Sequence, residues 1–474
     1  MKISNQKIFT NVLQQGLNVA RTSSNIISVS NNSEIPFEIL LPENFDLEKE
    51  ALQQLVYFAH FTSAKGTKMK CACATPDFHK GSTIPVGSVV VTPENLVIPS
   101  AIGTDINCGM RLHKTGLNLE QFLSKKKEIV ALLKGDLLEG TRDIPTTGVA
   151  MTALFQDGLS AFWDEMSKEK NHRGIFSKID FKKVENELYK LHESAFISGN
   201  SKYAPEALTH RDWMRDPSFG TLGGGNHFCE FQVISQIKDK RKAFELGLKV
   251  GDVVYMIHTG SRDVGFFVGN RWMDKAKELY PAGIKHPKNK IYAIEDDFVE
   301  DYLQAMHSAA HYATANRAII AEVIRQRINE VVVNGIADND LITDVPHNII
   351  LKEKIGNVHR KGATPAYEGQ LLLIPGSMGH DSYLLSGLGN DKWLQSASHG
   401  AGRNYSRNTI SFKGKKDFSL LGLDGIECIT LKEERMIEEA PAAYKEIGEV
   451  IRTQVEEEIV DPVAVFSPLL TFKA

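Results

Sequence analysis

Long apolar runs are missing from this sequence of 474 residues. No stretch approaches the roughly 18–20 apolar residues that cross a bilayer, and Met1–Lys7 lacks the apolar core of a signal peptide. Cysteine is scarce, and an odd number of cysteines does not suit a disulfide framework. The five are Cys71, Cys73, Cys108, Cys229 and Cys428. The sequence therefore predicts a cytoplasmic protein with reduced thiols.

An excess of positive charge is missing as well. Lysine and arginine number 55 against 59 aspartates and glutamates, which gives a formal net charge of −4. A protein dedicated to binding duplex DNA is usually basic, so this balance disfavours that class. An enzyme acting on RNA needs only a local basic groove, so RNA is not excluded. The short run Lys125–Lys127 is interpreted as a solvated helix face in preference to an RNA contact.

A regular alternation of strands and helices is also absent, and there is no internal repeat, low-complexity segment or evident linker. Hydrophobic residues make up 42% of the chain, enough for a sizeable core. Interspersed strands and helices favour an α+β fold over a doubly wound sheet. We expect a single catalytic domain over residues 1–474. Within it, residues 145–212 are poor in motifs and predict a peripheral, more helical insertion.

Hydrophobic periodicity and helix-capping residues predict the main elements. Helical patterning is expected in residues 7–29, 46–62, 183–198, 297–332 and 437–459, and from Asn118, as the N-cap, to about Lys134. Strands are expected at 251–258, 370–374 and 463–472, with a hairpin over 87–98 that turns at Thr92-Pro93-Glu94-Asn95.

The octet Gly103–Met110 carries an acid and a thiol three residues apart, Asp105 and Cys108, framed by glycines. Glycine permits tight turns and a close approach of the backbone to a ligand. Carboxylate and thiolate are both ligands of divalent metal ions. The octet therefore predicts one edge of a metal or anion site.

Several histidines share one context, a strand end or a glycine-rich turn. They are His227 in Gly223–Phe228, His258 in Ile257–Arg262, His347 in Val345–Asn348 and His399 in Ser398–Arg403. One such histidine is usually structural, but several of them beside Asp105 and Cys108 favour a metal site. Because the residues are far apart in sequence, a catalytic centre is favoured over a structural zinc site, and a bridging thiolate would allow two ions. His307 and His311 could form a metal pair on a helix, but a core position is favoured.

Two glycine-containing loops, Pro375–Gly379 and His399–Gly402, can present backbone N–H groups to a phosphate. Neither matches a Walker loop, and each alone would more often be a tight turn. Arg262, Arg403 and Arg407 lie beside the histidine segments. Guanidinium groups match phosphate geometry bidentately, which favours the anion-binding interpretation.

The chain resembles the RtcB family of RNA ligases. The matching stretches are PDFHKGSTIPVGSVV, IPSAIGTDINCGM, GTLGGGNHFCE, HTGSR, VPHN, HRKGAT, LLIPGSMG, SHGAGRNYSR, EEAPAAYKEI and PLLTFKA. They occur in the family's order from about residue 70 onward. Residues 1–60 and 145–212 contribute little to the resemblance. Asp263 and Tyr405 depart from common family residues, which affects the expected substrate preference more than activity.

The resemblance implies a GTP- and Mn²⁺-dependent enzyme that joins RNA 2′,3′-cyclic phosphate or 3′-phosphate ends to 5′-hydroxyl ends, in tRNA splicing or RNA repair. By that resemblance His399 becomes guanylylated, and two Mn²⁺ ions are held by Asp105, Cys108, His227, His258 and His347. The implied GTP pocket comprises Asn226, His227, Phe228, Glu230, His347, Asn348, Pro375, Gly376, Ser377, Met378, Ser382, His399, Gly400, Ala401, Gly402 and Lys473. Arg262, Arg403 and Arg407 would position RNA phosphates.

Two other functions stay open on the sequence. The first is an enzyme that guanylylates RNA 3′ ends, or a metal-dependent phosphoesterase, without sealing. The second is a non-catalytic RNA- or ribosome-associated protein, which the intact set of ligands and His399 disfavours. An activating protein partner is also among the expectations.

Overall fold

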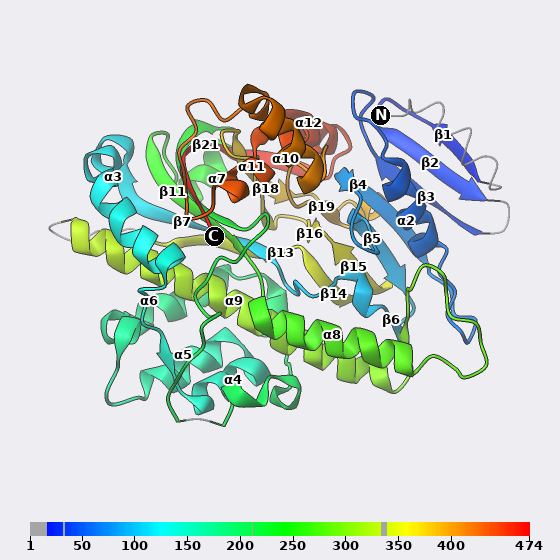
Figure 1. Cartoon of the computed structure of the whole chain (residues 1–474), viewed down its shortest axis with the longest axis horizontal. Coiled ribbons are helices and arrows are strands. Elements are labelled where there is room, and N and C mark those ends of the chain that lie inside the picture. The colour runs from blue at the N-terminus through cyan, green and yellow to red at the C-terminus, as the bar shows by residue number, and fades with distance from the viewer. Residues whose placement is uncertain (1–16, 32–33, 211, 333–338) are drawn as a thin grey trace.

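The computed structural model describes residues 17–31, 34–210, 212–332 and 339–474, and its described part is built around two large, mostly antiparallel sheets (Figure 1). The first sheet runs in the order β1 (Asn18–Arg21), β2 (Ile26–Asn31), β3 (Glu34–Leu40), β4 (Cys71–His79), β5 (Val86–Thr92), β15 (Gly356–Lys361) and β14 (Asn348–Glu353). The second runs β13 (Leu341–Pro346), β7 (Gly109–Asn118), β11 (Asp252–Thr259), β10 (Phe228–Ile237), β21 (Val460–Lys473), β18 (Ser382–Gly387) and β17 (Leu371–Ile374), with β20 (Cys428–Thr430) beside β21. Helices and antiparallel sheets thus confirm the α+β prediction.

Two helices cover one face of the second sheet. They are α9 (Phe298–Val331), the longest helix in the described part, and α3 (Leu119–Lys134). Apolar side chains of α3, such as Phe122, and of α9, such as Ile324, pack with Tyr255 and Phe231 of the sheet. Asn118 caps α3 as predicted: its side chain accepts from the Gln121 N–H while the Gln121 side chain accepts from the Asn118 N–H. This packing fixes the strands whose ends carry the site.

The first sheet has its own core, formed with α2 (Lys49–Ala59) and α12 (Ile447–Glu456). The remaining α-helices of the described ranges are α4 (Gly148–Asp157), α5 (Leu159–Ser167), α6 (Phe181–Asn186), α7 (Lys240–Glu245), α8 (Arg262–Glu278), α10 (Arg407–Lys416) and α11 (Glu433–Glu438). Three short pairs complete the strands: β6 (Leu96–Val97) with β12 (Ile294–Glu295), β16 (Ala363–Pro365) with β19 (Ser396–Ser398), and β8 (Pro145–Thr146) with β9 (Met214–Arg215). No helix in the described ranges is long and apolar enough to cross a membrane.

The segment 145–212 begins with β8 and is followed by β9, the strand that pairs with β8, and its helices α4 and α5 pack against α9. Buried Glu187, within this segment, lies 3.4 Å from Arg111 of β7 and also pairs with Arg325 of α9. A pair of strands at the base and charges buried against the core fit an insertion within one domain. That organisation stays a prediction.

Three predicted elements were wrong. Residues 87–98 do not form a hairpin, because β5 pairs with β4 and β15 whereas β6 pairs with β12. The described part of 7–29 forms strands β1 and β2 instead of a helix, and residues 7–16 lie outside the described ranges. Residues 183–198 form the end of α6 followed by short 3₁₀ turns. Local patterning was misleading in each case because the partner strand or packing surface is distant in sequence.

Other predicted elements were confirmed with small shifts. The expected helix over 46–62 is α2, and that over 297–332 is α9. The strands expected at 251–258, 370–374 and 463–472 are β11, β17 and β21. Of residues 437–459, Ile447–Glu456 is α-helical, whereas Pro441–Ala443 is a 3₁₀ turn.

Candidate metal and nucleotide site

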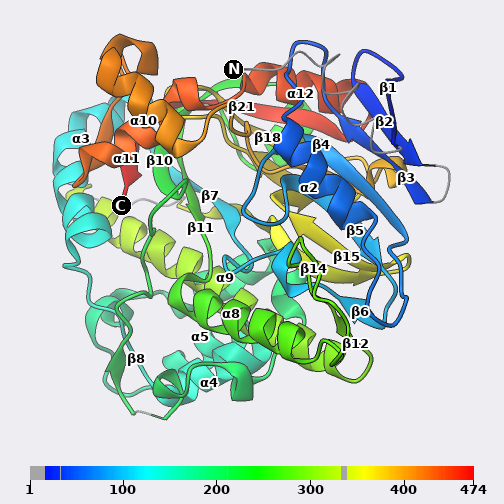
Figure 2. The same cartoon turned by 45° about the vertical axis from the view of Figure 1, so that its right-hand side comes forward.

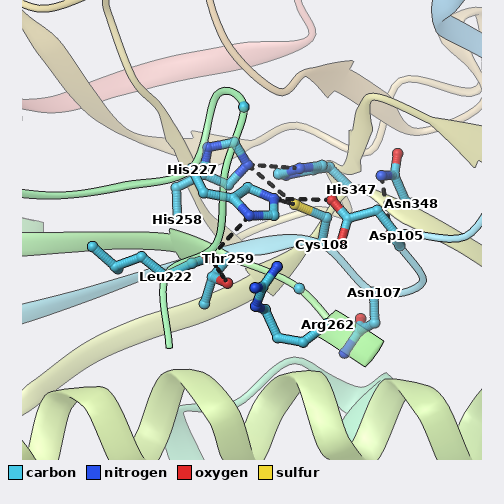
Figure 3. A network of polar contacts seen from close by, with 12 residues as sticks. Asp105, Asn107, Cys108, Leu222, His227, His258, Thr259, Arg262, His347 and Asn348 are labelled. Atoms are coloured by element: carbon cyan, nitrogen blue, oxygen red, sulfur yellow. Dashed lines mark hydrogen bonds and ion pairs between the residues drawn. The ribbon is translucent and has the colours of Figure 1, made fainter. Parts of the chain in front are cut away.

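Side chains from four separate segments converge on the Cys108 thiol (Figure 3). Cys108 Sγ lies 3.3 Å from His227 Nε2 and 3.2 Å from His258 Nε2. His258 Nε2 lies 3.2 Å from His347 Nε2, and His227 Nε2 lies 3.0 Å from Asp105 Oδ2. The structure therefore brings together all five side chains that the resemblance assigns to metal binding.

The register of the second sheet explains this convergence. Strands β13, β7, β11 and β10 are neighbours, and their ends at one edge are aligned: Pro346 pairs with Gly109, and His258 pairs with both Met110 and Phe228. Cys108 and His227 each come just before their strands, and His347 comes just after β13. Because the ends are adjacent, residues more than a hundred positions apart meet at one point.

The donor atoms suit a divalent cation. A hydrogen bond between His227 Nδ1 and the Leu222 carbonyl, at 3.0 Å, directs the lone pair of Nε2 toward Cys108. Burial lowers the pKa of His258 and of His347, which keeps both imidazoles neutral, the form that binds metals. Lone pairs of nitrogen and sulfur crowded at 3.2–3.3 Å repel one another unless a cation or a proton lies between them.

The pKa values of the two remaining candidate ligands are shifted in opposite directions. Burial and the nearby Asp105 carboxylate raise the pKa of the Cys108 thiol. Burial also works to raise the pKa of Asp105, but the charge and hydrogen bond of His227 outweigh it and lower that pKa. A thiol with a raised pKa becomes a thiolate only when a cation is bound, as a coordinating metal does. The residues present therefore fit a metal site.

Glycine is required next to this cluster. A Cβ at Gly260, directly after β11, would lie 2.1 Å from Asp105 Oδ1. At Gly402, where φ is +74°, a Cβ would lie 2.3 Å from the Asp77 carbonyl oxygen. Any side chain at either position would displace an acidic residue of the site.

His399 lies against a buried acid that sequence reasoning did not identify. His399 Nδ1 lies 2.6 Å from Asp77 Oδ2, and the His399 backbone N–H donates to the same oxygen at 3.2 Å. Asp77 is fully buried, and its other oxygen accepts from the Thr75 hydroxyl. Burial opposes ionisation of Asp77, but the charge and hydrogen bond of His399 outweigh it and lower the pKa of the acid. The pair fixes the His399 ring with Nε2 directed away from Asp77.

The five candidate ligands, Asp105, Cys108, His227, His258 and His347, are called the metal cluster below. A cavity of about 530 Å³ is lined by members of this cluster and by His399. The rings of His347 and His399 are 4.8 Å apart, centre to centre. Nineteen of the predicted residues line the cavity, and they are Asp105, Cys108, Asn226, Phe228, Glu230, His258, His347, Asn348, Pro375, Gly376, Ser377, Met378, His399, Gly400, Ala401, Gly402, Arg403, Arg407 and Lys473. Three predicted residues do not line it: His227, Ser382 and Arg262.

Glu230 lines the cavity, and Ser382 supports the Pro375–Met378 loop that also lines it. The Ser382 hydroxyl accepts from the Gly376 N–H at 3.2 Å and from Gln232 Nε2 at 2.9 Å, so it supports the Pro375–Met378 loop from behind. Buried Glu230 accepts from Gln232 and from Thr471. Burial raises the pKa of Glu230 to about 7, partly offset by those hydrogen bonds and by Lys473.

Lys473 is buried at the end of β21. Its Nζ donates to the carbonyls of Gly225 and His227, at 3.3 and 3.2 Å. Strand β21 pairs along its length with β10, and this pairing carries the lysine to the cavity.

The three arginines are positioned differently. Arg403 and Arg407 both donate to buried Glu439, at 3.2 and 2.9 Å. Arg403 also donates to the carbonyls of Tyr405 and Glu438, so its donors are largely used within the protein. Arg407 is 43% exposed and faces the cavity.

Arg262 begins α8. Its Nε donates to the Thr221 hydroxyl at 2.9 Å, which holds it against the loop that precedes His227 (Figure 3).

Sequence reasoning missed several further residues that line or support the cavity, among them Asp77, Lys361, Glu439 and Tyr444. Lys361 Nζ donates to the Ile102 carbonyl, next to the octet Gly103–Met110, which we call the metal loop. Tyr444 donates to Glu439. The signal for Asp77 was its place in PDFHKG, two residues before His79. His307 and His311 lie buried in the α9 core away from the cluster, as the favoured interpretation held.

Comparison with known proteins identifies the family of this chain. The family model described as tRNA-splicing ligase RtcB matches residues 59–474. A tRNA-splicing ligase RtcB of Thermococcus kodakarensis is 32% identical over 435 residues, covering 84% of this chain and 87% of its own. The proteins of that name from Methanococcus maripaludis and Aeropyrum pernix are 30% and 31% identical, covering 90% and 87% of this chain and 92% and 90% of their own. This chain belongs to the RtcB family.

Proposed function

We propose that this protein is an RNA ligase that joins a 3′-phosphate or 2′,3′-cyclic phosphate end to a 5′-hydroxyl end through a histidine–GMP intermediate. The relatives' name, tRNA-splicing ligase, supports RNA ligation in tRNA splicing. The single observation that carries the histidine chemistry is the position of His399, held by Asp77 on the wall of a cavity that the metal cluster also lines. A covalent intermediate on histidine divides one difficult phosphoryl transfer into two easier steps.

In the proposed mechanism, Asp77 accepts the Nδ1–H of His399 and leaves the Nε2 lone pair free. His399 Nε2 attacks the α-phosphorus of GTP, and the bond to the β-phosphate breaks with release of pyrophosphate. An oxygen of the RNA 3′-phosphate then attacks the same phosphorus, and the P–N bond breaks. Finally the 5′-hydroxyl attacks the activated 3′-phosphorus, loses its proton, and GMP leaves. A cyclic end is first hydrolysed to the 3′-phosphate.

Two divalent ions, Mn²⁺ by the family resemblance, would be held by Asp105, Cys108, His227, His258 and His347. Ions held there would neutralise the charge of the phosphates and make a hydroxyl group more nucleophilic. Arg407 faces the same cavity and matches phosphate bidentately. A cytoplasmic location and an activating partner belong to the same proposal.

Glu230 and Lys473 suit the guanine base. An ionised carboxylate accepts hydrogen bonds only, which matches the N–H donors of guanine, and a lysine ammonium donates to the guanine carbonyl. The Pro375–Met378 loop and the His399–Gly402 loop would hold the nucleotide's remaining groups.

The function is tested by incubating the protein with α-labelled GTP and Mn²⁺, then adding RNA with 3′-phosphate and 5′-hydroxyl ends. We expect covalent label that maps to His399 by mass spectrometry, is lost on chelation of the metal, and passes to joined RNA. Absence of protein-bound label, or label on another residue, would contradict the mechanism. Label that reaches RNA ends without joining would favour the capping alternative.

The raised pKa of Glu230 predicts how GTP affinity depends on pH. Only the ionised carboxylate can accept from guanine with both oxygens. Because the pKa of Glu230 is about 7, the affinity for GTP should rise as pH increases. Between pH 6 and pH 8 the Kd for GTP should fall roughly tenfold. The measurement uses His399→Ala protein so that binding is separated from the covalent step.

Glu230→Gln in that background is the matched control. It cannot ionise, so its Kd should be weaker at pH 8 and nearly constant over the same range. A Kd of the His399→Ala protein, with Glu230 intact, that does not change between pH 6 and pH 8 contradicts the role of Glu230.

A further inference from the structure

A separate cavity of about 290 Å³ lies at the C-terminal end of α8. It is lined by Thr83, Ser100, Met273, Lys277, Lys290 and Tyr292. Lys277 is in the last turn of α8, and Lys290 and Tyr292 come from the loop that follows this helix. We call this cavity, with the loop over residues 279–294, the lysine groove.

The loop that forms one side of the groove carries basic side chains and no acidic ones. Residues 279–294 contain Lys285, His286, Lys288 and Lys290 and no aspartate or glutamate. Lys277, Lys288 and Lys290 are exposed, and none forms an ion pair or side-chain hydrogen bond with any described residue. In a chain of net charge −4, three unpaired lysines at one place form a local positive surface that attracts polyanions.

An aromatic cluster gives this loop a defined shape. The rings of Tyr280 and His286 stack 5.1 Å apart, and Tyr292 contacts each ring edge-on. His286 Nδ1 lies 3.0 Å from the Tyr292 hydroxyl, and the Tyr280 hydroxyl donates to the Lys285 carbonyl. The packed rings therefore fix the conformation of the loop that carries Lys288 and Lys290.

One segment of the chain contributes to both the groove and the proposed active-site cavity. Lys80, Gly81 and Ser82 line the active-site cavity, and the next residue, Thr83, lines the groove. Helix α8 provides a second connection, since it runs from the centre of the molecule toward β12 (Figure 2).

On α8, Gly265 and Gly269 face Thr104 of the metal loop: a Cβ at Gly269 would lie 3.0 Å from Thr104 Cα. Met273 and Lys277 follow at four-residue spacing on the same face of the helix. Gly269 and Lys277 are thus about 12 Å apart along the axis.

We propose that the lysine groove binds the backbone phosphates of a single-stranded RNA whose end lies in the active site. The inference rests on RNA being the substrate, as proposed above. At about 3.4 Å per stacked nucleotide, the groove lies three to four nucleotides from the metal loop. Lysines along a track with aromatic residues are typical of sequence-independent binding to single strands.

The test compares the wild-type protein with the triple variant Lys277→Glu, Lys288→Glu, Lys290→Glu. Binding of a 12-nucleotide RNA with a 3′-phosphate, and of one with a 5′-hydroxyl, is measured by fluorescence anisotropy at several salt concentrations. We expect at least a tenfold weaker Kd for one or both RNAs in 50 mM salt. The slope of log affinity against log salt should fall by about 2, since each phosphate contact to a single strand contributes about 0.7.

A matched variant keeps the same change in net charge but places it elsewhere. Lys238→Glu, Lys240→Glu and Lys249→Glu alter exposed lysines in and around α7, which lies well away from the C-terminal end of α8 (Figure 1). This variant should keep the wild-type slope. An equal loss in both variants would show a net-charge effect and overturn the proposed groove, as would wild-type binding by the first variant.

Protein guanylylation by labelled GTP separates this inference from the proposed function. The triple Lys→Glu variant of the groove should take up label at the wild-type rate, because none of its three lysines lines the active-site cavity. The triple Lys→Gln variant repeats the test without charge reversal and should lower the slope by the same mechanism. If the wild-type protein binds RNA through the groove but takes up no label, the ligase mechanism fails and the groove stands.

Discussion

Asp77→Asn should slow guanylylation of His399 by about 10²- to 10⁴-fold while leaving GTP and metal binding unchanged. The asparagine amide can donate to Nδ1, where the carboxylate only accepts. An Nδ1 that accepts places the ring proton on Nε2, which removes the lone pair that attacks phosphorus. The corresponding Asp→Asn change in a serine protease triad costs about 10⁴ for the same reason.

The rate is measured as a single turnover of label uptake at saturating GTP. Asp381→Asn is a suitable control because Asp381 accepts from Ser467 beside the Pro375–Met378 loop and does not contact His399. We expect the control to stay within about twofold of the wild-type rate. A fast Asp77→Asn protein would show that the ring is oriented by other contacts.

Arg317→Met should lower the free energy of unfolding by about 3–5 kcal/mol, the usual cost of removing one partner from a buried pair. Arg317, on α9, is 1% exposed and forms two parallel hydrogen bonds with Asp344 of β13. Its other nitrogen donates to the carbonyls of Asn107 and Thr259, at 2.8 and 3.0 Å. Methionine fills similar space but leaves the carboxylate and both carbonyls without this donor.

Asn107 and Thr259 directly adjoin Cys108 and His258, two of the proposed metal ligands, so the variant should also bind Mn²⁺ more weakly. Urea unfolding gives the first effect, and metal titration gives the second. Arg452→Met removes an arginine that pairs with Glu449 and Glu456 at the surface and should cost about 1 kcal/mol or less. Equal losses in the two variants would contradict the role assigned to Arg317.

The convergence of the five proposed metal ligands could be predicted from sequence because each of them lies in a short segment with its own signature. Asp105 and Cys108 share one glycine-framed octet, and the histidines share a strand-end context. A segment of this kind can be identified from residues that are neighbours in the sequence. The strand β11 and helix α9 were predicted for the same reason, since periodicity is local.

The rest of the site depends on contacts across the chain. Asp77 and His399 are 322 positions apart, and nothing in either segment identifies the other as its partner. Glu439 appears as an ordinary surface acid in a charged segment, yet it is 1% exposed and binds two arginines. The hairpin error has the same origin: the turn after Thr92 was recognised, but the partners of its two strands were set by other parts of the sheets.

The pairing of β21 with β10 has a consequence for the order of events during folding. These strands are more than two hundred residues apart, and β21 lies between β10 and β18 inside the sheet. Pairings of such high contact order form slowly, after local helices and hairpins. His227, directly before β10, receives its neighbour Lys473 only when this pairing is complete. The centre should therefore assemble in the last phase of refolding, and metal ions added to the chain should act on that phase rather than on the initial collapse.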